Sequence, residues 1–200
     1  MSLTVNGSSA SSIAPIEEGT HLAVCSMIID LGQQYSEVYK TSSRKVLIGW
    51  EIPDETIELD DGPHPRTLSK TYTASLNENA NLRQDLAAWR GRDFTPEELA
   101  AFDLRNISGK SCLINVIHKE SNGKTYANIQ NIMALPKGMK PGKLDEPPVI
   151  YDIDSDPIEQ VESLPKWIQD RIKKSTSYQE KLNAAPAMEE LEDESGELPF

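Results

Sequence analysis

The sequence predicts a mainly β fold: a five-stranded barrel with a helical insertion between the third and fourth strands, followed by a C-terminal helix and a disordered acidic tail. Three observations support this prediction. Five segments rich in β-formers are separated by turn signals. Between the third and the fourth of them, the hydrophobic spacing becomes helical. The last fourteen residues carry six acidic side chains and neither Lys nor Arg.

The first three strands follow a polar, Ser-rich arm, which we expect to be flexible over residues 1–15. The run 21–30 consists largely of β-formers and predicts the first strand. The second strand is expected at 45–52, where Pro53 ends it. The third strand, 66–76, is dense in Thr, whose branched side chain favours extended backbone.

Residues 77–91 form the predicted helical insertion. Leu82, Leu86 and Trp89 stand at i, i+4 and i+7, and a Gly at the end of the segment provides a C-cap. A second, shorter helix is expected after Thr95, which begins a capping box with Pro at the first helical position. The insertion therefore separates the third strand from the fourth.

The last two strands are predicted to form a hairpin. Segments 110–118 and 126–135 are rich in β-formers, and Asn122-Gly123 between them is the sequence of a tight turn. Three strands, a helical connection and a two-stranded hairpin are the element order of the five-stranded Greek-key barrel called the OB-fold. We therefore expect an OB-fold domain over residues 16–136.

The C-terminal part divides into three predicted segments. Residues 137–162 are rich in Pro and Gly and indicate a linker or strap. An amphipathic pattern predicts a helix over 163–182 that packs on the barrel. Residues 183–200 are expected to be a disordered acidic tail, because burying unpaired charges is strongly unfavourable.

The composition restricts the possible partners. Without the six tail carboxylates, the net charge of −12 falls to −6, so a nucleic-acid site would require Lys and Arg to cluster on one side. Neither a signal peptide nor a membrane-spanning run is visible, which favours a cytoplasmic protein without a membrane partner. Cys25 and Cys112 lie in apolar segments and are expected to be buried thiols. The edges of a partly open barrel permit a homodimer.

Binding of single strands without sequence readout requires aromatic faces for the bases and cations along the phosphates, and each stacked base contributes about 1–3 kcal/mol. Strand alternation places Arg66, Lys70 and Tyr72 on one side of the third strand. In the alternative interpretation, the strand tyrosines are packing residues. The candidate contacts to single-stranded DNA are Lys45, Arg66, Lys70, Tyr72, Lys119, Lys124, Tyr126 and Asn128.

The sequence favours a binding protein over an enzyme. The three histidines are far apart, neither cysteine has a partner at zinc spacing, and there is no Gly-rich phosphate-binding loop. We therefore expect no catalytic residue, no metal and no cofactor. The alternative of a metal-dependent nuclease would use the carboxylates Asp54, Glu55, Asp60 and Asp61.

The C-terminal tip Glu197-Leu198-Pro199-Phe200 resembles the end of the acidic tails of bacterial and phage single-stranded DNA-binding proteins. It departs from the bacterial tails in detail, because Glu largely replaces Asp and Ser195-Gly196 interrupts the run of charge. The resemblance implies that Leu198, Pro199 and Phe200 dock replication or recombination proteins that offer a basic, apolar-lined pocket.

Short motifs in the body, within residues 17–138, resemble phage proteins of this size, some of them single-stranded DNA-binding; they include Trp50-Glu51-Ile52-Pro53, Trp89-Arg90-Gly91-Arg92 and Tyr126-Ala127-Asn128-Ile129. The resemblance implies a phage or prophage origin, a location in the cytoplasm of an infected or lysogenic bacterial cell, and a function in phage DNA replication or recombination. The alternative is an adaptor of the same fold that binds only protein, and the acidic net charge favours it.

Overall fold

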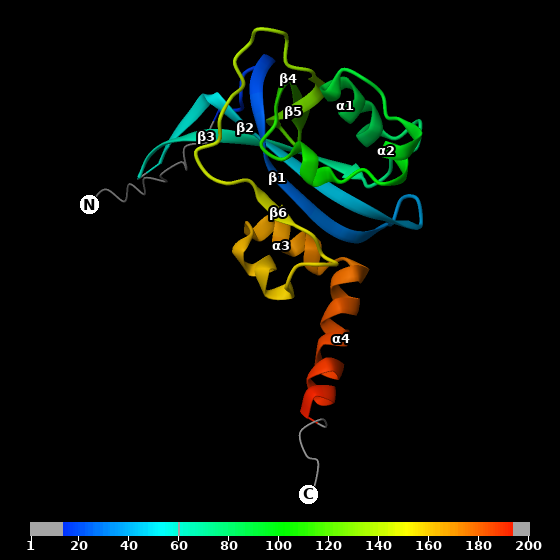
Figure 1. Ribbon diagram of the computed structural model, residues 1–200. Helices are drawn as coiled ribbons and strands as arrows, with labels where there is room; N and C mark the ends of the chain where they lie inside the picture. Colours follow the sequence, from blue (N-terminus) through cyan, green and yellow to red (C-terminus); the bar gives the residue numbers. More distant parts are fainter. Residues whose placement is uncertain (1–13, 60, 194–200) are drawn as a thin grey trace, which may run out of the picture.

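The computed structural model describes residues 14–59 and 61–193. The strands are β1 (Gly19–Ser36), β2 (Thr41–Leu59), β3 (Gly62–Thr73), β4 (Ser111–Ser121), β5 (Lys124–Met133) and β6 (Val149–Tyr151). The helices are α1 (Asn81–Arg90), α2 (Pro96–Ala100), α3 (Lys166–Lys173) and α4 (Thr176–Asp193), with 3-10 turns η1 (Leu104–Ile107) and η2 (Ile158–Ser163). Hydrogen-bonded strands follow the order β3-β2-β1-β4-β5, and β6 pairs with β1 (Figure 1). The prediction of a mainly β fold is confirmed.

The sheet curves because its longest strands change partners along their length. β1 is antiparallel to β4 over Gly19–Val24 and antiparallel to β2 over Val24–Ser36. Bulges interrupt the β1–β2, β2–β3 and β4–β5 ladders, and bulges add local bend and twist. In the described part of the chain, β3 and β5 nevertheless share no ladder. The structure therefore has an open six-stranded sheet where the sequence predicts a five-stranded barrel.

Helix α1 packs against both β3 and β5, two strands that approach each other without forming a ladder. It contacts both strands, and its residues Leu82, Leu86 and Trp89 are buried in the main hydrophobic cluster. The ring of Trp89 lies against that of Trp50 on β2, with centroids 5.9 Å apart. The helical insertion thus supplies part of the core, as its apolar spacing predicted.

Three local signals in the sequence are confirmed. Gly91 ends α1 in the left-handed conformation, with φ of 69°. Thr95 caps α2 in a complete capping box with Glu98. Asn122 and Gly123 form the β4–β5 turn with φ of 51° and 71°, the positive values that a type I′ turn requires. Each of these signals depends on a few consecutive residues, so the turn and the two caps could be predicted without the tertiary structure.

The segment 137–162 is more than a linker. Val149–Tyr151 form β6, which runs parallel to Met27–Ile29 of β1, and η2 follows it. Apolar side chains of this segment meet α3 on the opposite side of β1 and β2 from α1. The resulting second hydrophobic cluster comprises Ile29, Leu31, Leu47, Tyr151, Ile153, Val161, Leu164, Ile168 and Ile172.

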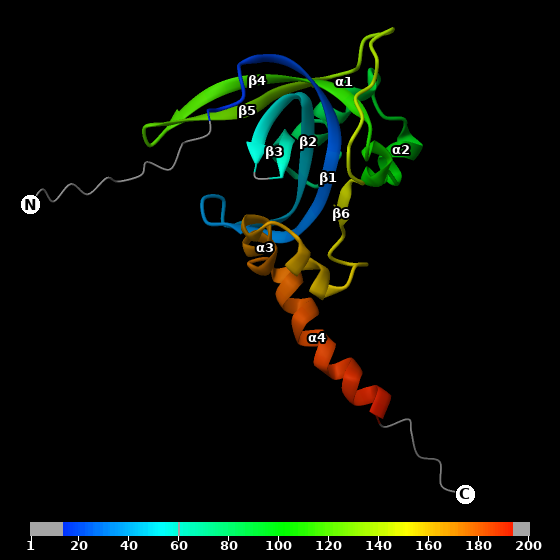
Figure 2. The same ribbon diagram turned by 90° about the vertical axis from the view of Figure 1, so that its left-hand side faces the viewer.

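The predicted helix over 163–182 is two helices that meet at Ser175. The buried Ser175 hydroxyl donates to the Ile172 carbonyl and accepts from the Tyr178 amide, which caps the start of α4. α4 then continues to Asp193, into the segment that the sequence assigned to a disordered tail. Figures 1 and 2 show α4 leading away from the sheet.

Candidate nucleic-acid interface

The side of β3 that carries Lys70 and Tyr72 faces the interior. Tyr72 is 3% exposed, and its hydroxyl donates to Asp85 Oδ2 of α1 over 2.7 Å. Lys70 Nζ donates to the same oxygen, also over 2.7 Å. Burial, reinforced by the charge of Asp85, raises the pKa of Tyr72 above its ordinary value, so the phenol remains a donor. These two side chains join β3 to α1 and are not available as the ligand contacts that the sequence analysis assigned to them.

Arg66, on the same side of β3, is also occupied. Its Nη2 donates to the carbonyl of Ala14 over 2.7 Å, and its Nη1 lies 3.8 Å from Glu55. Ile16, two residues after Ala14, is buried in the main cluster, and its carbonyl oxygen lies 2.8 Å from His118 Nε2. Arg66 therefore helps to hold the start of the described chain against the sheet.

The opposite side of β3 is open to solvent and lined with hydroxyl groups. The side chains on this outer face are Thr67, Ser69, Thr71 and Thr73. Lys45 Nζ donates to Thr73 Oγ1 over 2.7 Å, and Arg171 Nη1 of α3 donates to Thr71 Oγ1 over 2.9 Å. Among the described residues, neither cation forms an ion pair with a carboxylate. Burial lowers the pKa of Arg171, the direction expected for a charge that has lost water without gaining a carboxylate.

The β4–β5 hairpin brings four other predicted contacts together. Lys119 stands directly opposite Tyr126, so their side chains share a face of the hairpin. Lys124 and Asn128 lie two residues to either side of Tyr126 along β5 and therefore share that face. Tyr126 is 49% exposed, enough to offer a ring face to a base. The register of the hairpin thus places these four residues on one face.

The β1–β2 loop adds exposed rings that the sequence analysis did not select. Tyr39 is 78% exposed, and Tyr35 and Val38 beside it also stand in solvent. Lys40 follows with φ of 52°, which forms the tight reversal between the strands. Two tyrosines and a lysine between two β-rich runs were the available signal, but a loop has no periodicity that assigns its side chains to a face.

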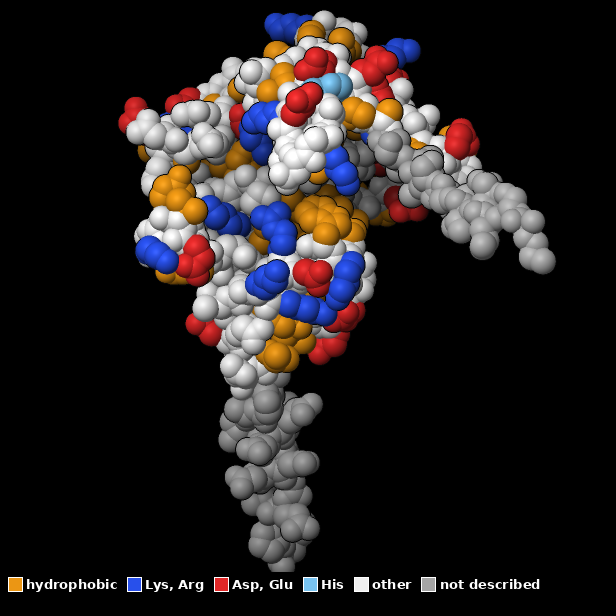
Figure 3. Space-filling view, turned by 180° about the vertical axis from the view of Figure 1, so that it is seen from behind, with side chains coloured by type: hydrophobic (Ala, Val, Ile, Leu, Met, Phe, Trp, Pro, Cys, Tyr) orange, Lys and Arg blue, Asp and Glu red, His pale blue; other side chains and the backbone are white. Residues whose placement is uncertain are grey.

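The two hairpins project on the same side of the molecule, with β3 between them. Figure 2 shows the β1–β2 loop and the β4–β5 hairpin pointing the same way, and α3 lying below them. Figure 3 views this side directly: Lys and Arg side chains gather over α3 and the neighbouring strands, and a hollow separates them from the hairpin above. We call this surface the groove face, and it comprises Tyr39, Lys40, Lys45, Thr71, Thr73, Lys119, Lys124, Tyr126, Asn128 and Arg171.

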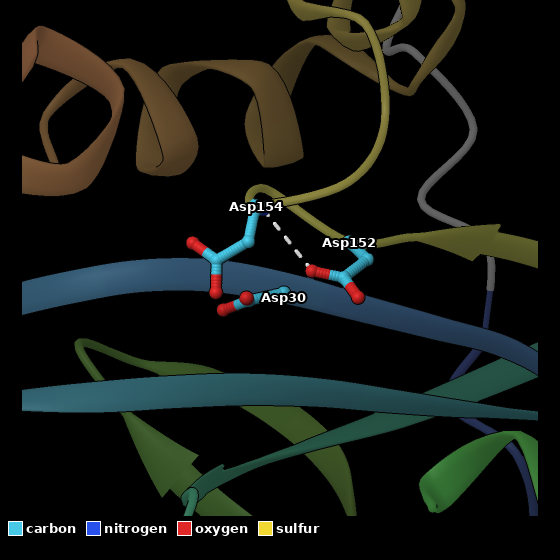
Figure 4. A group of neighbouring side chains, drawn as sticks. All are labelled: Asp30, Asp152 and Asp154. Atoms are coloured by element: carbon cyan, nitrogen blue, oxygen red, sulfur yellow. Dashed lines mark hydrogen bonds between the residues drawn. The ribbon is translucent and has the colours of Figure 1, made fainter. Parts of the chain in front are cut away.

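Three neighbouring carboxylates outside the groove face form ion pairs with arginines. Oxygens of Asp30, Asp152 and Asp154 lie within 4.8 Å of one another (Figure 4). Arg44 lies among them: it pairs with Asp30, and its Nη2 is 2.7 Å from Asp154 and 3.8 Å from Asp152. Arg105 adds a hydrogen bond of 2.9 Å to Asp152. Two guanidinium groups thus pair with the three carboxylates and offset two of their three charges, and the network ties the segment after β6 to β1 and β2.

The carboxylates considered for a nuclease are dispersed among other partners. Glu55 lies 3.9 Å from His21, and Asp61 lies 2.8 Å from His64. Asp60 falls outside the described residues. Within the described ranges, the set of three acidic groups close enough to share one ion is the Asp30 group above, and it includes none of the four.

Some predicted residues lie beyond the described part of the chain. Leu198, Pro199 and Phe200 belong to 194–200, and most of the predicted arm belongs to 1–13, both outside the described residues. No helix in the described ranges is both long and apolar enough to cross a membrane. No protein-family model matches this sequence, and no curated protein matches it significantly.

Proposed function

We propose that this protein binds single-stranded DNA along the groove face, without sequence readout, in phage DNA replication or recombination. The observation that carries the proposal is the contrast in pairing: the cations Lys45 and Arg171 contact hydroxyls of β3 instead of carboxylates. Exposed tyrosines stand on the hairpins above and beside them. Cations along the phosphates and rings for the bases are the requirements of a single-strand binder.

The strand order supports an assignment to the OB-fold. Strands β1 to β5 with α1 between the third and fourth follow the element order of that fold, with β3 and β5 as the neighbours that closure would bring together. In OB-folds, oligonucleotides bind over the second and third strands, between the loop that joins strands one and two and the loop that joins strands four and five. The groove face occupies this position.

A titration with end-labelled oligo-dT, followed by fluorescence anisotropy at several salt concentrations, tests the proposal. Binding should weaken with salt, by a slope of about −0.7 per phosphate contacted in a plot of log K against log salt, because counterions are released. Absence of binding even at low ionic strength would reject it.

The adaptor that binds only protein remains the second candidate, because Val38 and Tyr39 present an exposed apolar loop tip and the tail tip resembles a docking peptide. A chain ending at Ala187, which lacks the six tail carboxylates, separates the two candidates. If the chain is a DNA-binding protein, removal of the tail should strengthen binding, since the tail repels phosphates and competes for the same cations. If neither version binds DNA while the full chain retains a protein partner through its tail, the adaptor is correct.

A further inference from the structure

Helix α3 carries a line of side chains beside the outer face of β3, which we call the stripe. Ile168 and Ile172 point into the second hydrophobic cluster and fix the rotation of the helix. Trp167, Arg171 and Lys174 stand at i, i+4 and i+7, so they lie in one line that flanks the buried side of the helix. Arg171, in the middle of this line, makes the hydrogen bond to Thr71 of β3. The stripe is therefore continuous with the groove face.

The charge of this stripe opposes that of the chain. The segment 166–174 contains four cations and one carboxylate, in a chain whose net charge is −12. Lys166 pairs with Asp170 over 3.2 Å, and Lys173 pairs with Glu162. Among the described residues, Arg171 and Lys174 form no such pair. Two cations on the stripe are thus available to an anionic ligand.

Trp167 contributes little to the hydrophobic core. Its side chain is 49% exposed and belongs to neither hydrophobic cluster, whereas Trp50 and Trp89 are buried. The backbone of Trp167 lies about 6 Å, just over one helical turn, along the axis of α3 from that of Arg171. A ring beside cations on an extended basic surface is the arrangement that stacks a base and holds its phosphates.

We propose that α3 continues the interface: a single strand that leaves the outer face of β3 passes Arg171 and stacks a base on Trp167, with a phosphate near Lys174. This inference rests on the proposed function and names a binding element outside the barrel strands and their loops. It implies that the segment after the barrel lengthens the footprint on DNA, so a long oligonucleotide gains contacts that a short one cannot make.

Tryptophan fluorescence tests the inference, because Trp167 is the exposed one of the three tryptophans in the chain. Full-length protein is titrated with oligo-dT, with emission and the anisotropy of an end-labelled oligonucleotide recorded together. Emission should fall as anisotropy rises. The Trp167→Ala variant should lose this response and bind a long oligo-dT about 10-fold more weakly, while its affinity for one of about ten nucleotides stays unchanged. Leu182→Ala, which shortens an exposed apolar side chain of α4, is the matched control and should behave as wild type.

A charge-reversal pair gives an independent measurement. Lys174→Glu should weaken binding of the long oligo-dT by several fold and reduce the salt slope by about 0.7, as expected for one lost phosphate contact on a single strand. Lys140→Glu makes the same change of charge at an exposed position of the segment 137–148, outside the groove face and α3, and should have little effect. Binding with unchanged emission, and equal affinities for wild type and both α3 variants, would overturn the inference but leave the proposed function standing. Absence of any anisotropy change at low salt would overturn both.

Discussion

The two faces of β3 carry polar side chains with opposite uses. On the inner face, Lys70 and Tyr72 share the single carboxylate oxygen Asp85 Oδ2. On the outer face, Lys45 and Arg171 reach only the hydroxyls of Thr73 and Thr71. Both faces are rich in hydrogen bonds, but only the outer face leaves positive charge uncompensated. A cation is thus available to an anionic ligand only where no carboxylate of the protein pairs with it. Residue type alone does not show which cations meet this condition.

The largest expected effect comes from the inner face. Asp85→Ala should lower the free energy of unfolding by about 3 kcal/mol, because it leaves the buried Tyr72 hydroxyl and the half-buried Lys70 ammonium without their acceptor. Urea denaturation measures this loss. Asp170→Ala removes an exposed carboxylate and should change stability by less than about 0.5 kcal/mol.

If the inner face of β3 serves only the fold, the folded Asp85→Ala protein should bind oligo-dT as wild type does. A variant that kept its stability but lost DNA affinity would reverse the assignment of the two faces.

The outer face should show the reverse behaviour. Lys45→Glu should weaken oligo-dT binding by about 10-fold and reduce the salt slope by about 0.7, because it removes a phosphate contact and adds repulsion. Its urea midpoint should stay close to that of wild type, since Lys45 makes only a hydrogen bond to Thr73 at the surface. Lys140→Glu again controls for net charge, and equal losses in both variants would mean that the effect is not local to the groove face.

The smallest expected effect concerns the ion pairs that Glu98 of α2 forms with Arg90 and Arg92 at the end of α1. Hydrogen bonds from Arg92, then from the Thr95 amide and Arg90, lower the pKa of Glu98 from 4.5 to about 2. Because the folded-state pKa is depressed, the stabilisation is present in full above pH 4.5 and is lost as the pH falls toward 2. Glu98→Gln should therefore lower the melting temperature at pH 7, and the gap to wild type should close as the pH falls.

Thermal melts of the two proteins between pH 7 and pH 3 measure this gap, with oligo-dT affinity at pH 7 expected to be unchanged. A gap that stays constant down to pH 3 would show that the carboxylate charge of Glu98 is not what stabilises the corner.

The sequence predicted most elements because their signals are local. The Asn122-Gly123 turn, the Gly91 C-cap and the Thr95 capping box each depend on a few consecutive residues, and all three are present. The segment 137–162 was harder to interpret, because its apolar residues are scattered among prolines and become core only where β6 and α3 bring them together. The break at Ser175 also went unpredicted, since its capping serine lies within a continuous helical pattern.

The candidate site was predicted in part. Lys119, Lys124, Tyr126 and Asn128 were among the candidate contacts, and the register of the hairpin places them on one face. Arg66, Lys70 and Tyr72 were correctly grouped on one side of β3, but that side proved to be the inner one. Tyr39 and Arg171 were not selected at all, because one lies in a loop and the other on a helix remote in sequence.

By itself, the sequence determined the strands, the turns and which side chains share a face, because alternation and capping operate over a few residues. It could not determine which face of β3 would be covered, because Asp85 arrives on α1 from a later part of the chain. The tertiary structure also decided where the uncompensated cations lie, since α3 brings Arg171 to Thr71 from 100 residues away in sequence. Charge pairing is a property of neighbours in space, and only the fold brings such neighbours together.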